Sequence, residues 1–228
     1  MKFTLSRLKL RYGGFWGLSK AAATGLVIAG SAATAEPTII TAFGDSLTHG
    51  YGLAQGDGFV PQLQAWLRDQ GADVTVVNAG VSGDTTAGGA ARIDWSLADE
   101  PDALIVALGG NDVLRGQSPE AARANLETIL QKAAPRPVLL IGIGVPGNYG
   151  PDYKADFEAI YPALAEKYDT LLVDDFLGPL AAQAPIEQVM DTYMQGDGIH
   201  PNAAGVALIV EEIGPKVLQL IARAQSRG

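Results

Sequence analysis

Residues 38–52 read Thr38-Ile39-Ile40-Thr41-Ala42-Phe43-Gly44-Asp45-Ser46-Leu47-Thr48-His49-Gly50-Tyr51-Gly52. The first six are apolar or β-branched, which predicts a buried strand over residues 38–43. The chain then turns through three glycines spaced around one serine, Ser46. Open α/β sheets bind their ligands at the carboxyl ends of parallel strands, so Ser46 is a candidate nucleophile. A turn that merely ends a strand is the alternative interpretation.

The rest of the chain alternates between strand and helix patterns. Apolar runs predict four more strands, at residues 74–77, 103–108, 138–143 and 170–173. Apolar residues at helical spacing predict helices over residues 58–70, 118–133, about 157–168 and from about residue 203. This alternation indicates an α/β fold of three layers, in which helices cover both faces of a five-stranded parallel sheet.

The first 35 residues have a different composition from the rest. They hold five basic residues and no acidic ones, and an apolar run of small residues ends in Ala33-Thr34-Ala35. This pattern is typical of a secretory signal peptide and predicts cleavage after Ala35. The alternative is a membrane anchor, but the run is shorter than the ~20 residues that a bilayer needs. We expect residues 36–228 to form a single domain, periplasmic or secreted, without stable membrane insertion after processing.

The charge balance limits the classes of partner. Residues 36–228 carry 11 Lys and Arg against 25 Asp and Glu, a net charge of −14. Such an acidic chain is not expected to bind nucleic acid. The 228 residues include no cysteine and two histidines, so neither a disulfide nor a bound metal or other cofactor is expected.

A serine hydroxyl needs a base to accept its proton, and the base needs an orienting acceptor. The chain offers His49 and His200. His200 follows Asp197 by three residues, so the carboxylate can hold one ring nitrogen while the other faces Ser46. His49 lies three residues after Ser46, and the local turn decides whether its ring can reach back. We predict His200 as the base, with a surface histidine as the alternative.

An ester hydrolase also needs donors for the oxyanion. Gly80 permits close approach of its backbone N–H, and Asn111 supplies a side-chain N–H after the next strand along the chain. Each is also compatible with an ordinary turn. Ser82 is the rival serine within a glycine-containing turn.

Together, these segments resemble a known family. Gly44-Asp45-Ser46-Leu47, Gly80, Gly110-Asn111-Asp112 and Asp197-x-x-His200 resemble the four blocks of the SGNH (GDSL-type) hydrolases. Residues 78–86, 109–116 and 147–150 are similar to the periplasmic thioesterase I, lysophospholipase and arylesterase branch. The resemblance implies the flavodoxin-like SGNH-hydrolase fold. It also implies that the N–H of the nucleophile Ser46 forms an oxyanion hole with Gly80 and Asn111, while Asp197 orients His200.

The expected activity is hydrolysis of carboxylic esters or thioesters of acyl chains through an acyl-enzyme on Ser46. The partner is then a small acyl ester, and Val113, Leu114 and Tyr149 are candidate substrate-binding residues near the site. One alternative is a carbohydrate O-acetyl esterase with the same catalytic residues. Another is a non-catalytic module of this fold that binds an acyl or glycan ligand.

Overall fold

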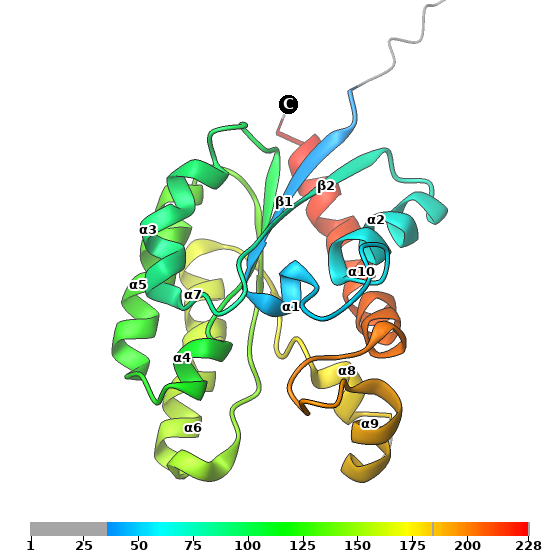
Figure 1. Ribbon diagram of the computed structural model, residues 1–228. Coiled ribbons are helices and arrows are strands. Elements are labelled where there is room, and N and C mark those ends of the chain that lie inside the picture. The colour runs from blue at the N-terminus through cyan, green and yellow to red at the C-terminus, as the bar shows by residue number, and fades with distance from the viewer. Residues whose placement is uncertain (1–35, 184, 228) are drawn as a thin grey trace, which may run out of the picture. The chain divides into compact units, whose positions relative to one another are not determined.

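A computed structural model describes residues 36–183 and 185–227 (Figure 1). The predicted signal peptide lies outside these residues, so its cleavage stays a prediction. From Glu36 onward the chain forms one compact unit. No helix in this described part is long and apolar enough to cross a membrane.

Five strands form one parallel sheet in the order β2-β1-β3-β4-β5. Their bounds are β1 (Thr38–Gly44), β2 (Val74–Gly80), β3 (Ala103–Ala107), β4 (Val138–Ile141) and β5 (Leu171–Val173). Gly44, the last residue of β1, pairs with Gly80 on one side and with Ala107 on the other. The chain moves outward from β1 to β2 and then back across β1 to β3, so the strand order reverses there. Ser46 follows β1 directly and therefore lies at the switch point where open α/β sheets bind ligands.

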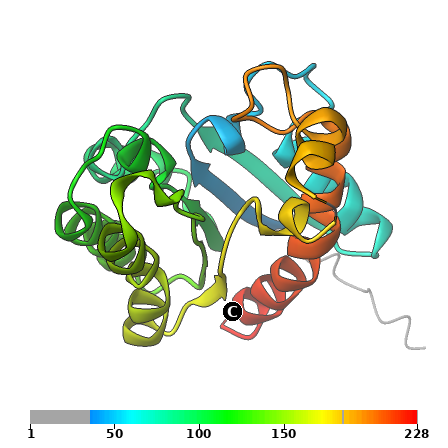
Figure 2. The ribbon, with the colours of Figure 1, turned by 90° about the horizontal axis from the view of Figure 1, so that it is seen from below.

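Two groups of helices cover the two faces of the sheet (Figures 1 and 2). One face carries α2 (Phe59–Asp69) and α10 (Ala203–Gln225), with α8 (Gly178–Ala181) and α9 (Ile186–Tyr193) packed against α10. The other face carries α3 (Thr86–Ser96), α5 (Pro119–Ala133), α6 (Pro151–Glu158) and α7 (Ile160–Tyr168). Three short helices lie in loops that follow strands: α1 (Ser46–His49), α4 (Gly110–Leu114) and η1 (Gly147–Tyr149). The predicted three-layer α/β fold is confirmed.

Neighbouring residues of each strand pack into two different cores. In β3, Ala103, Ile105 and Ala107 join the core under α2 and α10, whereas Leu104 and Val106 join the core under α5 and α7. A strand that is buried on both faces has no position for a polar side chain, which explains the continuous apolar runs. Each large apolar side chain buried in this way contributes about 1.5–3 kcal/mol to folding.

The elements differ from the predicted ones mainly at their ends. β2 continues to Gly80, although the sequence predicted a turn after Val77, because residues 78–80 pair with the last three residues of β1. Helix α3 was not predicted; the side chain of Thr85 caps it by accepting a hydrogen bond from the Gly88 N–H. The helix expected around residues 157–168 is divided into α6 and α7.

Candidate active site

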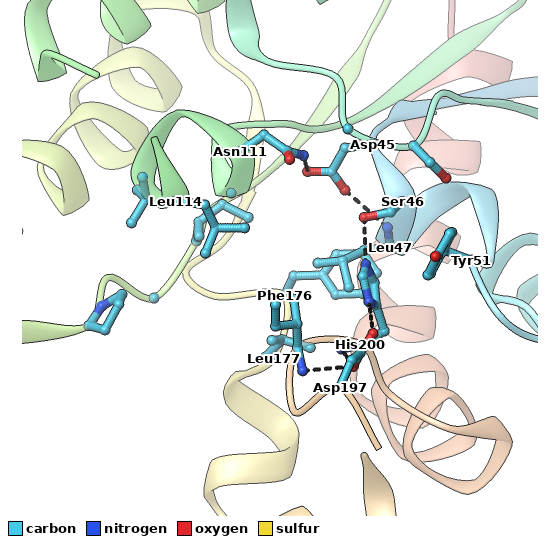
Figure 3. A pocket seen from close by; sticks show the side chains of 18 of the residues that line it. Asp45, Ser46, Leu47, Tyr51, Asn111, Leu114, Phe176, Leu177, Asp197 and His200 are labelled. Carbon is cyan, nitrogen blue, oxygen red and sulfur yellow. Dashed lines mark hydrogen bonds and ion pairs between the residues drawn. The ribbon is translucent and has the colours of Figure 1, made fainter. Parts of the chain in front are cut away.

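The turn after β1 presents the Ser46 hydroxyl at the carboxyl edge of the sheet. Ser46 is the first residue of α1, and Oδ1 of Asp45 caps this helix by accepting a hydrogen bond from the Leu47 N–H at 3.0 Å. Gly50 ends α1 in the left-handed conformation that glycine adopts readily. The single-turn helix leaves the Ser46 side chain pointing toward His200 (Figure 3).

His200 and Asp197 reach Ser46 from the other end of the chain. His200 Nε2 lies 2.8 Å from Ser46 Oγ, and His200 Nδ1 lies 2.6 Å from Asp197 Oδ2. The other oxygen of Asp197 accepts the backbone N–H groups of Ile199 and His200 at 2.9 and 3.0 Å. The bond to His200, followed by those two backbone bonds, lowers the pKa of Asp197 to about 2. The carboxylate is therefore ionised at neutral pH and can hold the imidazole with one nitrogen toward the serine.

Asn111 approaches the same place from α4, after the adjacent strand β3. Its Nδ2 lies 3.4 Å from Asp45 Oδ2, and Figure 3 shows the two side chains facing each other. Asp45 is only 2 % exposed, and this burial raises its pKa to about 6. The carboxylate accepts from one amide hydrogen of Asn111, which leaves the second one for another acceptor.

Two contacts tie the Asn111 segment to the segment after β2. Asp112 is fully buried, and its carboxylate accepts the Thr86 N–H at 2.8 Å and the Thr86 hydroxyl at 2.6 Å. Arg115 Nη2 donates to the Gly83 carbonyl at 2.9 Å. These contacts are needed because β2 and β3 are not neighbours in the sheet, so no backbone ladder aligns their ends with each other.

The structure corrects the prediction for Gly80. This residue ends β2, its N–H donates to Asn78 Oδ1 at 2.9 Å, and it does not line the cavity beside Ser46. Gly83, three residues later, lines that cavity together with Ser46 and Asn111 and has a φ of 81°. The backbone N–H suited to an oxyanion is thus the one of Gly83, because that of Gly80 already has an acceptor.

A cavity of about 500 Å³ opens beside Ser46. Most of its wall is apolar, formed by Leu47, Val113, Leu114, Ile143, Pro146, Phe176, Leu177 and Ile199. Val113 and Leu114 line it as the sequence predicted. Tyr149 does not: it is 44 % exposed, and its hydroxyl donates to the Leu114 carbonyl at 3.4 Å. The sequence offered no indication of Phe176, whose segment after β5 packs against this wall only through tertiary contacts.

The polar part of the cavity wall is acidic. Asp45, Asp175 and Asp197 line it, and within the described part of the chain no Lys or Arg does. Asp175 Oδ1 accepts the backbone N–H groups of Gly144 and Leu177 at 2.9 and 3.0 Å. Among residues 36–183 and 185–227 no three His, Cys, Asp or Glu side chains form a potential metal site.

Ser82 also lines the cavity, but it is paired with the other histidine. Its Oγ lies 3.2 Å from His49 Nδ1. In the described residues no carboxylate bonds to His49 in the way that Asp197 bonds to His200. The geometry therefore favours Ser46 over Ser82 as the residue that a base can activate.

Several known proteins are similar to this chain in sequence and fold. Residues 42–208 match the GDSL-like Lipase/Acylhydrolase family. "Esterase TesA" of Pseudomonas aeruginosa is 41 % identical over 86 % of this chain and 94 % of its own length. "Thioesterase 1/protease 1/lysophospholipase L1" of Escherichia coli K12 is 37 % identical over 83 % of this chain and 87 % of its own length. The crystal structure of AlinE4, an SGNH-hydrolase family esterase, is 44 % identical, with a TM-score of 0.66 over 81 % of this chain and 97 % of its own.

Proposed function

The chain belongs to the GDSL-like lipase/acylhydrolase family and hydrolyses ester bonds, and on this premise we propose that it cleaves carboxylic esters or thioesters of acyl chains through an acyl-enzyme on Ser46. One observation carries the proposal. The 2.8 Å contact between Ser46 Oγ and His200 Nε2, backed by Asp197 at 2.6 Å, lines a mostly apolar cavity. The family membership and this arrangement together leave the non-catalytic binding module without support.

In the acylation step, His200 Nε2 takes the proton of Ser46 Oγ as this oxygen attacks the ester carbonyl carbon. Asp197 keeps the Nδ1–H of His200 directed at itself and stabilises the imidazolium that forms. When the tetrahedral intermediate collapses, His200 returns the proton to the leaving oxygen or sulfur. The acyl group stays on Ser46 until water, activated by the same imidazole, releases it as a carboxylic acid.

The oxyanion of each tetrahedral intermediate needs nearby hydrogen-bond donors. We assign this role to the N–H groups of Ser46 and Gly83 and to Nδ2 of Asn111, because all three residues line the cavity. The buried carboxylate of Asp45 orients the amide of Asn111. Donors that are already in place cost no reorganisation when charge appears on the oxygen.

The cavity wall supports an acyl chain as the group that is bound. Aliphatic and aromatic side chains form most of the wall, and the volume of about 500 Å³ is typical of a site for a small ligand. A glycan would need exposed flat aromatic surfaces, and of the two aromatic rings among the described lining residues Tyr51 is exposed whereas Phe176 is buried. These features favour an acyl ester over a carbohydrate O-acetyl ester.

The charge of the site favours substrates with an uncharged leaving group. Asp175 and Asp197 contribute negative charge to the wall, and the chain from residue 36 onward has a net charge of −14. A polyanionic leaving group such as coenzyme A is repelled by this field, whereas an aryl or alkyl alcohol is not. We therefore place uncharged esters ahead of acyl-CoA thioesters.

The place of action is proposed from the first 35 residues. The basic residues, the apolar run and the Ala33-Thr34-Ala35 sequence support export and cleavage before Glu36. Intact-mass measurement of the protein recovered from the periplasm or the medium tests this. A protein that retained residues 1–35 would contradict it.

The experiment that tests the function uses the protein that begins at Glu36. It compares p-nitrophenyl esters of increasing acyl length, acyl-CoAs, a lysophospholipid and acetylated xylan. We expect the highest kcat/KM on an uncharged acyl ester and turnover to stop in Ser46→Ala. Preference for acetylated xylan would instead establish the carbohydrate esterase.

A further inference from the structure

The loop that carries His200 lies outside the sheet. It connects α9 to α10, and its two ends, Met194 and Pro201, form an isolated antiparallel bridge with each other. The strand register that places Ser46 therefore does not place this loop. Because Ser46 and His200 are nonetheless held 2.8 Å apart, other contacts must fix the loop against the turn after β1.

Gln195 makes these contacts with its side-chain amide. Its Nε2 donates to the Tyr51 carbonyl at 2.8 Å and to the Pro201 carbonyl at 2.9 Å. Its backbone N–H donates to the His200 carbonyl at 2.8 Å, and its own carbonyl accepts the Gly198 N–H at 3.0 Å. One residue thus holds the backbone at His200 and at the residue that follows it.

Tyr51, which accepts the bond from the Gln195 amide, is itself attached to the Ser46 turn. Tyr51 donates its N–H to the Ser46 carbonyl at 3.1 Å, and its ring centroid lies 4.8 Å from that of His200. The bond from Gln195 to Tyr51 therefore connects the Ser46 turn to the His200 loop across 144 positions of sequence. Both hydrogens of one amide group are needed for this connection.

The amide of Gln195 also lies next to Gly52. A Cβ atom added to Gly52 would lie 2.2 Å from Gln195 Oε1, so the backbone of the Ser46 turn packs directly on the amide. Gly52 has a φ of 75°, in the region that favours glycine. The amide thus has a backbone neighbour at Oε1 and two hydrogen bonds from Nε2.

We propose that Gln195 is a positioning residue that sets the distance and direction between Ser46 Oγ and His200 Nε2. The inference rests on the proposed roles of Ser46 and His200. Gln195 does not line the cavity, so it acts on the reacting atoms through the backbone of both loops rather than on the substrate. A misplacement of about 1 Å between reacting groups can cost 10²-fold in rate. Loss of the amide should thus lower kcat and leave KM nearly unchanged.

Gln195→Met tests this, because methionine has a similar length but no N–H donor. We expect kcat on a p-nitrophenyl ester to fall about tenfold or more, with KM within about twofold of that of the unmodified protein. The rate at which a fluorophosphonate labels Ser46 should fall by the same factor, since that reaction needs the same proton transfer.

Gln62→Met is the matched control. Gln62 Nε2 also joins two backbone carbonyls distant in sequence, Asp57 at 2.7 Å and Ala203 at 3.1 Å, but touches neither Tyr51 nor His200. Gln62→Met should lower the melting temperature about as much as Gln195→Met does, but its kcat should stay within about twofold of that of the unmodified protein. The inference is overturned if Gln195→Met keeps its kcat, or if both variants lose kcat equally.

Gly52→Ala disturbs the same contact from the other side and leaves Gln195 intact. We expect its kcat to fall, and we expect the double variant with Gln195→Met to lose less than the product of the two single losses, because both act through one contact. If the loss of kcat in the double variant equals the product of the two single losses, the inference is overturned. Should Gln195→Met not fold, an unchanged kcat in Gly52→Ala would overturn it instead. Neither result touches the proposed function, which is tested separately by the activity of Ser46→Ala and by the substrate panel.

Discussion

Two regions of the molecule meet at the candidate active site. Each contains an aspartate, and the surroundings of the two aspartates shift their pKa values in opposite directions. The strand-end region comprises residues 44–46 and 110–112, at the carboxyl ends of β1 and β3. The closing loop comprises residues 194–201. Burial in the strand-end region raises the pKa of Asp45 to about 6. Hydrogen bonds in the closing loop, first of all that of His200, lower the pKa of Asp197 to about 2.

This difference shows two ways of placing a functional side chain. The sheet places Ser46 and Asn111 through buried strands, and the polar groups that follow these strands are buried with them at a cost in stability. The closing loop has no buried strand, so it places His200 through hydrogen bonds from half-exposed groups such as Gln195 and Asp197. The strand-end region therefore carries electrostatic strain, whereas the closing loop depends on the completeness of its hydrogen bonds.

The largest expected effect comes from removing the contact between Ser46 and His200, which joins the two regions. Ser46→Ala and His200→Ala should each lower kcat by roughly 10⁴–10⁶, and the double variant should be no worse, because the two groups act as a unit. Kinetics and fluorophosphonate labelling followed by mass mapping measure this. Ser82→Ala and His49→Ala are the controls and should change kcat only modestly. A label on Ser82, or a greater loss in His49→Ala than in His200→Ala, would contradict the assignment.

A smaller effect is expected when only the strand-end region is changed. Asn111→Ala should lower kcat by roughly 10²–10³ with little change in KM, because the donor acts mainly once charge has formed on the oxygen. Asn111→Asp should be at least as damaging, since it turns a carboxylate toward the oxyanion. Steady-state kinetics and the melting temperature of both variants separate this role from a structural one. A normal kcat with a lowered melting temperature would make Asn111 a turn residue.

The opposite pKa shifts of the two aspartates predict opposite effects of pH on stability. Asp45 binds its proton more tightly in the folded protein, so its contribution to the free energy of unfolding should fall as the pH rises from about 4 to about 6. The rise in its pKa from 3.8 to about 6 corresponds to about 3 kcal/mol. Asp197 binds its proton less tightly when folded, so its contribution is present above about pH 4 and is lost as the pH falls toward 2.

Asp45→Asn separates these two contributions. At pH 7 the variant should be more stable than the unmodified protein by up to about 3 kcal/mol, and the advantage should disappear near pH 4. Its kcat should fall, because asparagine at position 45 would place an amide nitrogen opposite Asn111 Nδ2. Two donors cannot bond to each other, so the Asn111 side chain would turn its N–H away from the oxyanion. Urea unfolding between pH 4 and pH 7 gives the stability. A stability difference that did not vary with pH would show that the folded Asp45 is not strained.

The smallest expected effect concerns the negative charge of the cavity wall, which comes from the closing loop and from Asp175 after β5. Raising the salt concentration from 20 to 300 mM should increase kcat/KM for an acyl-CoA severalfold, because salt screens its repulsion from Asp175, Asp197 and the acidic surface. The kcat/KM for an uncharged p-nitrophenyl ester should stay within about twofold and serves as the control. A decrease in kcat/KM for acyl-CoA with added salt would indicate a cationic contact with this substrate. Acyl-CoA thioesters would then rank ahead of uncharged esters as substrates.

The residues of the strand-end region were predictable from the sequence, whereas the donor after β2 was not. Ser46 and Asn111 follow apolar runs, and such runs reliably predict buried strands. Gly80 was predicted as a donor because a glycine in the expected turn after Val77 permits close approach of its N–H, and because it matched a block of the family. Pairing with β1 carries β2 three residues further, so the loop glycine that reaches the cavity is Gly83.

Sequence pattern by itself determined the parallel α/β fold, the placement of Ser46 and Asn111 at strand ends, and the pairing of Asp197 with His200. These follow from local properties: buried strands need apolar residues, and three positions are a short enough separation for a carboxylate to reach a ring. Only the tertiary structure decided that Gly83 rather than Gly80 lines the cavity, that Tyr149 lies outside it, that Phe176 lines it, and that Gln195 connects the Ser46 turn to the His200 loop. Each of those depends on contacts between segments far apart in the chain, and no local preference of a residue encodes the partner that it will meet.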